Sequence, residues 1–156
     1  MKKLFCIVLI IPILLSFDKN DVSIVGKWKI DKYIEKLKVS NGQRLSDTAK
    51  ASRVDYFNFL ANGTVYTHFY YSTGISYDTE KKIVSLSSST EDRDYNSDTV
   101  SYRVSGNLLI LSKGGLSDTM RIQKLTDHEL VLYWPSKDTA DSKVTYTQES
   151  WRIFSR

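Results

Sequence analysis

The residues best spaced for chemistry in this 156-residue sequence form an acidic run at positions 92–98, DRDYNSD, with side-chain oxygens at alternate positions. Calcium-binding loops of the EF-hand type share that spacing, but they also require glycine at the sixth position and glutamate at the twelfth. Ser97 and Arg103 occupy those two positions here. We therefore interpret the run as a solvated acidic loop, and we expect neither a metal ion nor another cofactor.

Other candidate catalytic or metal-ligating side chains are scarce. His68 and His128 are the only histidines, and neither has clustered carboxylates beside it, which makes a poor metal site. The chain after its N-terminal segment contains no nucleophile elbow, zinc-protease motif or phosphate-binding glycine loop. Folding could still bring distant carboxylates together, but no particular pair stands out. We expect that the protein is not an enzyme.

The N-terminal segment has the layout of a secretory signal peptide. Lys2 and Lys3 form a basic start, residues 4–15 (LFCIVLIIPILL) are apolar, and Ser16 supplies a small residue. An apolar stretch of this length is shorter than the ~20 residues that a membrane-spanning helix needs. We therefore predict a signal helix over residues 1–17, a short polar linker over residues 18–24 and one domain over residues 25–156.

A bacterial lipoprotein signal would require cysteine directly after Leu14-Leu15-Ser16, and the residue there is Phe17. We therefore expect no lipid anchor, and we expect the mature protein to be periplasmic or secreted. Removal of the signal also removes Cys6, the only cysteine. The mature domain would then have no disulfide, no thiolate metal site and no cysteine nucleophile.

The composition is that of an ordinary soluble domain, with 41% hydrophobic and 26% charged residues. The formal net charge is +4, and without Lys2 and Lys3 the remaining 20 basic residues face 18 acidic ones, a balance of +2. This balance argues against a nucleic-acid or acidic-membrane binder. We expect a monomer whose partner is a small apolar or amphipathic ligand, or another protein, and not a nucleic acid.

From residue 25 onward, apolar and polar residues alternate in short segments, as they do in half-buried β-strands. Turn signals separate these segments, among them Asn62-Gly63 and Gly106-Asn107. The pattern predicts an all-β fold, an antiparallel up-and-down barrel of eight to ten strands. The nine strands that it indicates cover residues 25–34, 54–60, 64–71, 81–87, 99–105, 107–112, 118–125, 128–134 and 143–154.

Nine strands cannot close an up-and-down barrel, because such a barrel needs an even number. A hairpin tip at residues 39–44 could supply a tenth strand. One strand could instead lie outside an eight-stranded barrel. The only helix that we predict in the domain is short, with Ser46 as its cap and residues 47–52 as its body.

Up-and-down order also predicts which loops share an end of the barrel. The turn at Asn62-Gly63 would lie at one end with the loops at residues 88–98, 113–117 and 135–142. The loop at residues 72–80 and the turns at Gly106 and Asp127 would lie at the other end.

Four short motifs follow one another along the domain. They are G-K-W at residues 26–28, F-x-F-x-x-N-G-T at residues 57–64, Y-x-V-x-G-N-x-L-x-L at residues 102–111 and I-x-x-L-T-x-x-x-L-x-L at residues 122–132. In this order they resemble the bacterial lipocalin-like domain family, small secreted or periplasmic proteins mostly of unassigned function. The resemblance implies a lipocalin-like barrel, and it supplies no catalytic residue.

The resemblance also implies a role for one tryptophan. In lipocalins the tryptophan of the first motif packs at the closed end of the barrel beneath a basic side chain. That role would fall to Trp28, with Arg121 or Arg152 as the basic partner.

A ligand held in the barrel would contact side chains that point inward. The inward candidates that we name as ligand-binding residues are Trp28, Phe57, Phe59, Phe69, Tyr102, Leu109, Ile122 and Leu132. A second candidate site is an aromatic stripe, because Tyr66, His68 and Tyr70 share one face of the predicted strand at residues 64–71. Whether this stripe is exposed or lines the cavity depends on which face points inward, and strand propensity alone also explains the tyrosines.

The leading hypothesis is an exported lipocalin-like binding module. It would hold a small apolar or amphipathic ligand in the barrel, or bind a partner through its loops. The alternative is a structural or protein-interaction barrel with a filled core, such as an envelope subunit or a secreted inhibitor. Eight-stranded barrels can be filled or can hold one ligand, so a polar-lined cavity of roughly 300 Å³ or more would favour the binding module.

Overall fold

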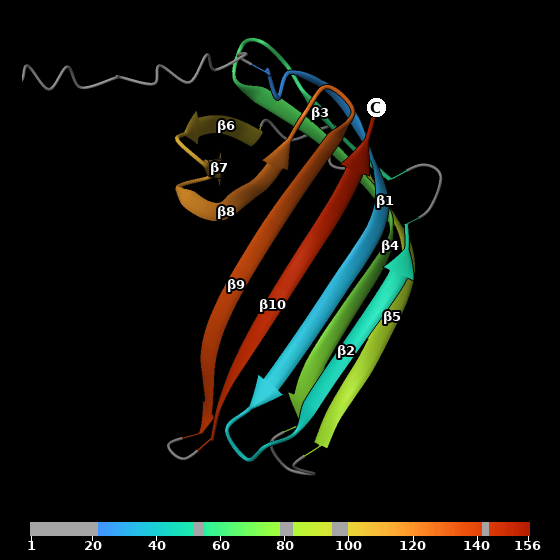
Figure 1. Ribbon diagram of the computed structural model, residues 1–156, viewed down its shortest axis with the longest axis vertical. Coiled ribbons are helices and arrows are strands. Elements are labelled where there is room, and N and C mark those ends of the chain that lie inside the picture. The colour runs from blue at the N-terminus through green and yellow to red at the C-terminus, as the bar shows by residue number, and fades with distance from the viewer. Residues whose placement is uncertain (1–21, 52–54, 79–82, 95–99, 142–143) are drawn as a thin grey trace, which may run out of the picture.

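The computed structural model in Figure 1 describes residues 22–51, 55–78, 83–94, 100–141 and 144–156, without the side chains of residues 69–94 and 138–141. Within these residues every regular element is a strand, which confirms the all-β prediction. The strands are β1 (Gly26–Val39), β2 (Arg44–Lys50), β3 (Tyr56–Phe59), β4 (Thr64–Asp78), β5 (Ile83–Asp94), β6 (Val100–Ser105), β7 (Leu108–Lys113), β8 (Leu116–Leu125), β9 (Glu129–Asp141) and β10 (Val144–Ser155).

Eight of these strands form a closed antiparallel ring. The hydrogen-bonded order runs β1-β3-β4-β6-β7-β8-β9-β10, and β10 pairs with β1 to complete the barrel. Each link in the ring is antiparallel. The barrel prediction is therefore confirmed.

The two remaining strands explain the odd count obtained from the sequence. β2 and β3 follow one another along the same edge of β1, with β3 opposite residues 26–29 and β2 opposite residues 32–38. In the same way β6 and β5 share one edge of β4. Ten strands thus occupy eight positions around the barrel, because two of the positions hold an interrupted strand.

The hairpin tip predicted at residues 39–44 exists, and β2 is the strand that it supplies. The predicted helix with Ser46 as its cap is wrong, because residues 44–50 are extended. Their exposure alternates from residue to residue, and half-buried Leu45 packs against Leu37 and Val39 on β1. This packing overrides a weak local helix signal.

A bulge in β1 changes which side chains point into the barrel. Trp28 and Ile30 are buried before it, and Tyr33, Glu35, Leu37 and Val39 are buried after it. The register against β10 shifts between Ile30 and Lys32, so Asp31 is the extra residue. The inward face therefore passes from even to odd residue numbers.

The barrel has a closed half and an open half. In Figure 1 the short strands β6, β7 and β8 gather at the upper end, and β9, β10, β1, β2, β4 and β5 continue downward. The loop assignment from the sequence is wrong, because the turns at Asn62-Gly63, Gly106-Asn107 and Asp127 all lie at the closed end. The β1–β2 hairpin adds a chain reversal, and residues 72–78, 88–94 and 135–141 are strand rather than loop.

Two apolar clusters occupy the described interior. The larger fills the closed half, and its buried members include Trp28, Phe57, Phe59, Leu109, Leu132 and Phe154. The smaller lies in the open half, where Leu37 and Val39 are buried beneath Leu45, Val144 and Tyr146. A band of polar interior residues separates them.

Candidate functional site

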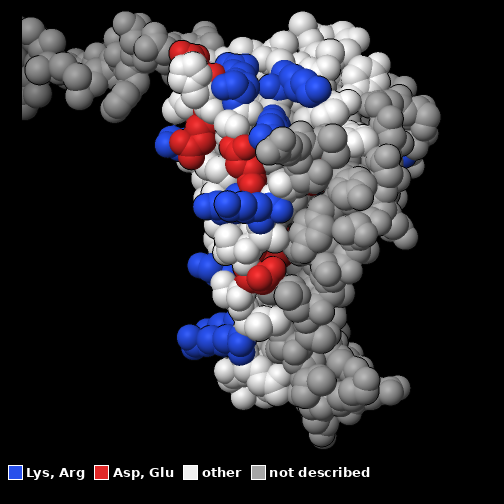
Figure 2. Space-filling model, turned by 90° about the vertical axis from the view of Figure 1, so that its right-hand side faces the viewer, with Lys and Arg blue, Asp and Glu red and all other residues white. Residues whose placement is uncertain are grey.

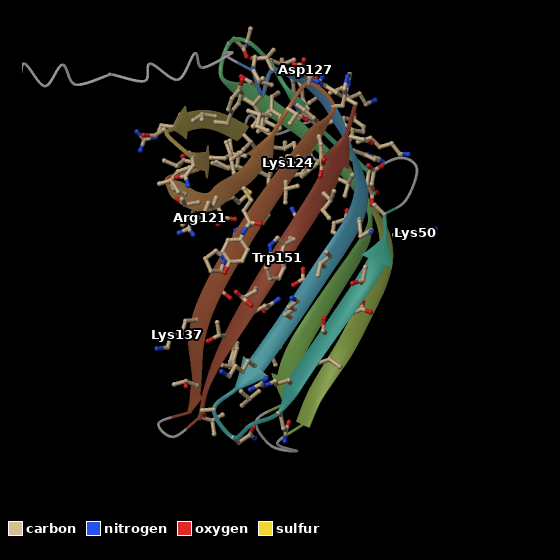
Figure 3. All side chains as sticks on the ribbon, viewed as in Figure 1. Lys50, Arg121, Lys124, Asp127, Lys137 and Trp151 are labelled. Atoms are coloured by element: carbon tan, nitrogen blue, oxygen red, sulfur yellow. The ribbon has the colours of Figure 1, made fainter. Side chains whose placement is uncertain are left out.

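The closed end of the barrel is locked by a tryptophan and an arginine. Trp28 is fully buried, and its indole Nε1 donates a hydrogen bond of 2.7 Å to the carbonyl oxygen of Ile24. The guanidinium of Arg156 lies 4.2 Å from the centre of the Trp28 ring. The same guanidinium donates hydrogen bonds to the carbonyl oxygens of Asp127 (2.6 Å) and Val25 (3.0 Å). Asp127 marks this end in Figure 3.

The basic partner of Trp28 is therefore Arg156, and the expectation of Arg121 or Arg152 is wrong. Arg121 is exposed on β8, and Arg152 lies further down β10, opposite Tyr33. Gly26 leaves space for the Arg156 side chain over Trp28, because a Cβ at position 26 would lie 3.2 Å from Nη1 of Arg156. Its φ of +127° also favours glycine. The Gly-x-Trp motif thus has a local steric reason.

Most of the inward candidates named from the sequence do lie in the interior. Trp28, Phe57, Phe59, Leu109 and Leu132 are buried in the large cluster, and Tyr102 and Ile122 pack against it half-buried. The side chain of Phe69 lies outside the described residues. These side chains pack against one another, for example Phe57 on Phe154 with ring centres 5.2 Å apart. Their role in ligand binding stays a prediction.

A polar pocket lies directly below this packed cluster. It has a volume of about 290 Å³, and its walls come from β1, β9 and β10. Trp134 connects the two regions, since it lines the pocket and also packs against the large cluster. The lining residues are Glu35, Trp134, Ser136, Gln148, Ser150 and Arg152.

Glu35 is the buried acidic group of the pocket, with an exposed fraction of 8%. Its Oε2 accepts hydrogen bonds from Nε2 of Gln148 (3.2 Å) and from the hydroxyl of Ser150. The β1–β10 register explains the arrangement, because Glu35 faces Ser150 directly and Gln148 is two residues away on the same face. A buried carboxylate is tolerated in a barrel only with such hydrogen bonds.

Arg152 is the basic group of the pocket, and it lies between two aromatic rings. Its guanidinium carbon is 4.6 Å from the centre of the Trp134 ring and 5.8 Å from that of Tyr33. Burial lowers the pKa of Arg152, and the nearby Tyr33, Glu35, Asp118 and Asp55 oppose that shift. Asp118 also accepts a hydrogen bond of 2.8 Å from the Trp134 indole. Carboxylates and aromatic faces thus surround this cation.

Tyr33 and Asp55 form a second buried polar pair beside Arg152. The Tyr33 hydroxyl donates a hydrogen bond of 3.0 Å to Oδ2 of Asp55, whose side chain is fully buried. Burial, followed by the neighbouring Asp55 carboxylate, raises the pKa of Tyr33 well above its usual value. The hydroxyl therefore stays protonated and serves as a hydrogen-bond donor.

The aromatic stripe lies on the outer face as far as its side chains are described. Val65 and Thr67 are buried, so Tyr66 and His68 point outward and are half-buried. His68 stacks on Tyr56 with ring centres 5.6 Å apart, and Lys27 lies 3.9 Å above the Tyr56 ring. The side chain of Tyr70 is outside the described residues. Figure 2 shows Lys and Arg side chains spaced along one face, with Asp and Glu between them.

Metal ligands do not gather in the described part of the chain, where no three His, Cys, Asp or Glu side chains could hold an ion together. The acidic run at residues 92–98 lies outside the residues whose side chains are described. Among the described residues we also find no helix with the length and apolar character needed to cross a membrane.

The sequence did not point to the polar pocket. Glu35 on β1 lies more than 90 positions before the pocket residues from β9 and β10, and the bulge at Asp31 decides that Glu35 faces inward. The last predicted strand carried no clear signal, because apolar Trp151 and Ile153 alternate with Ser150 and Arg152 and favour the opposite face as the inner one.

The sequence matches a family of known proteins. A family model described as a lipocalin-like domain matches residues 24–132, which is more than half of the chain. No curated protein and no solved structure matches.

Proposed function

Because the chain belongs to the lipocalin-like domain family, we propose that it is an exported binding module that holds one small amphipathic ligand in its open half. The observation that carries this proposal is the pocket of about 290 Å³ lined by Glu35, Trp134, Gln148 and Arg152. This volume is close to the lower bound of roughly 300 Å³ for small-molecule sites. A short ligand therefore fits better than a long lipid.

The closed half has little room for a ligand. Trp28, Phe59, Leu109 and Leu132 have exposed fractions of 0% and pack against each other. We infer that these candidates form the floor beneath the ligand. The polar head of the ligand would contact the pocket, and an apolar part would reach Trp134 or the small cluster around Leu37.

The filled closed half also supports the second candidate, a structural or protein-interaction barrel. In that case a partner protein would bind the outer face or the loops, where Lys27, Tyr56 and His68 are stacked. Aromatic side chains such as Tyr56 are enriched in protein interfaces. The two functions differ in whether the pocket retains a small molecule.

Native mass spectrometry of the protein purified from its own host tests the binding function. We expect a retained mass that disappears on denaturation. Ser136→Phe would fill the pocket from an exposed position, and this variant should lose the retained mass. Thr147→Phe places the same ring at an exposed position on β10 outside the pocket lining, so it should keep the mass. Absence of a retained mass from the wild-type protein would argue for the interaction barrel, and equal retention in both variants would contradict binding in this pocket.

Export is proposed from the basic start at Lys2 and Lys3 and from the apolar residues 4–15. The intact mass of the protein from an extracytoplasmic or culture fraction tests it. We expect a chain that begins near residue 17, without a lipid modification. A full-length chain confined to the cytoplasm would contradict export without affecting the binding function.

A further inference from the structure

The polar pocket contains one carboxylate and one guanidinium, and they are not equally available to a ligand. Glu35 is held through one of its oxygens, Oε2, by the neutral donors Gln148 and Ser150. These neutral donors do not offset the charge of the carboxylate, and Arg152 is the cation in the pocket lining that interacts with it. An opposite charge on a ligand would therefore gain a charge-assisted hydrogen bond at the pocket wall.

Arg152 is one cation facing three carboxylates, so the acidic groups around the pocket outnumber it. It interacts with the carboxylates of Glu35, Asp118 and Asp55, and it lies against the faces of Trp134 and Tyr33. An anionic ligand that approached Arg152 would meet those carboxylates at close range. Because like charges in a partly desolvated site repel each other strongly, an anion is disfavoured there.

The apolar surroundings indicate the rest of the ligand. The pocket lies between Trp134 at its upper side and the cluster of Leu37, Val39 and Tyr146 further along the same strands. The side chains of Glu35 and Leu37 are neighbours on the inner face of β1. A ligand whose charged head bonds to Glu35 can therefore lay a short apolar part on that cluster.

We propose that the pocket selects short amphipathic cations, such as primary alkylamines, with the ammonium group on the Glu35 carboxylate. This inference rests on the proposed binding function and names the ligand class for the same pocket. Trp134 adds an aromatic side chain to the lining, against which the apolar part of the ligand can pack.

Isothermal titration calorimetry at pH 7 with three matched probes tests the proposal. Octylammonium, octanol and octanoate share one chain and differ in the charge of the head group. We expect octylammonium to bind about tenfold more tightly than octanol, since both can donate a hydrogen bond to the carboxylate but only the ammonium adds an attraction between opposite charges. A tenfold difference corresponds to about 1.4 kcal/mol. Octanoate should bind most weakly.

Two variants test whether the charge preference arises in the pocket. Glu35→Gln keeps an oxygen that accepts from Gln148 and Ser150, and it should reduce octylammonium binding to the level of octanol. Ser136→Lys adds a cation at an exposed lining position. This variant should bind octylammonium more weakly and octanoate more tightly than the wild type. Glu149→Gln is the matched control, because Glu149 lies next to Ser150 but bonds to Tyr133 outside the pocket lining.

Each other outcome overturns a different part of the reasoning. Octanoate or octanol binding as tightly as octylammonium would overturn the charge preference and leave the binding function standing. An octylammonium preference that persists in Glu35→Gln would overturn the assignment to this carboxylate. Failure of all three probes to bind would overturn the cation proposal, and together with the absence of a retained mass it would remove the binding function as well.

Discussion

The contact between Arg156 and Trp28 can be tested by truncating the arginine. Arg156→Ala removes a ring contact at 4.2 Å and the hydrogen bonds to the carbonyl oxygens of Asp127 and Val25. Each hydrogen bond contributes about 1 kcal/mol net. A cation over an aromatic ring at an exposed site adds about 0.5–1 kcal/mol. We discount the sum for the exposure of Arg156, and we expect the free energy of unfolding to fall by about 2 kcal/mol.

Urea unfolding followed by circular dichroism measures this change. For a domain of this size a loss of about 2 kcal/mol corresponds to a decrease in Tm of roughly 4–8 °C. Arg121→Ala is the control, because Arg121 is exposed on β8 and should change the free energy by less than about 0.5 kcal/mol. Arg156→Lys should lower the free energy of unfolding by an intermediate amount, since a lysine keeps the charge but loses the forked donor. Equal free energies of unfolding for the Arg156→Ala and Arg121→Ala variants would refute the stabilising role of the contact between Arg156 and Trp28.

Three further changes test other parts of the barrel. Gly26→Ala should destabilise by about 1–3 kcal/mol, because φ is +127° and a Cβ meets Arg156; a wild-type urea midpoint would contradict this. Phe59→Ala should lower the free energy of unfolding by about 3–5 kcal/mol, since Phe59 is fully buried. Calorimetry measures this decrease. The raised pKa of Tyr33 stabilises the fold below the unfolded pKa of about 10, and this contribution is lost as the pH rises above it. Unfolding free energies between pH 8 and 11 should therefore fall less steeply in Tyr33→Phe than in the wild type, and equal slopes would show that Tyr33 is not the group responsible.

The hairpins of the barrel could be predicted because their signals are local. The turn at Asn62-Gly63 and the alternation on either side of it need no distant contact, and β3 and β4 form there as expected. The extent of the long strands could not be predicted in the same way. Polar residues such as those at 88–94 pair with β4 through their backbone. Such pairing does not require apolar side chains, so the hydrophobic pattern of the sequence does not reveal it.

The candidate site depended on two features that local sequence does not contain. The bulge at Asp31 reverses the inward face of β1, so Tyr33 and Glu35 point inward. Simple alternation from Trp28 and Ile30 would have placed Lys32 there instead. The buried charge of Glu35 is acceptable only because Gln148 and Ser150, more than 110 residues later, supply its donors.

The unequal packing of the two halves has a consequence for local opening of the native state. The closed half contains the large cluster around Trp28 and Phe59, and the described side chains of the open half contribute only the small cluster around Leu37. Free energies of local opening follow the buried apolar contacts. Amide hydrogens of β7 and of residues 26–30 in β1 should therefore exchange only through global unfolding, and those of β2 should exchange through smaller openings. A ligand bound against Glu35 would slow the exchange of β2 first, because it would add contacts where the barrel has fewest.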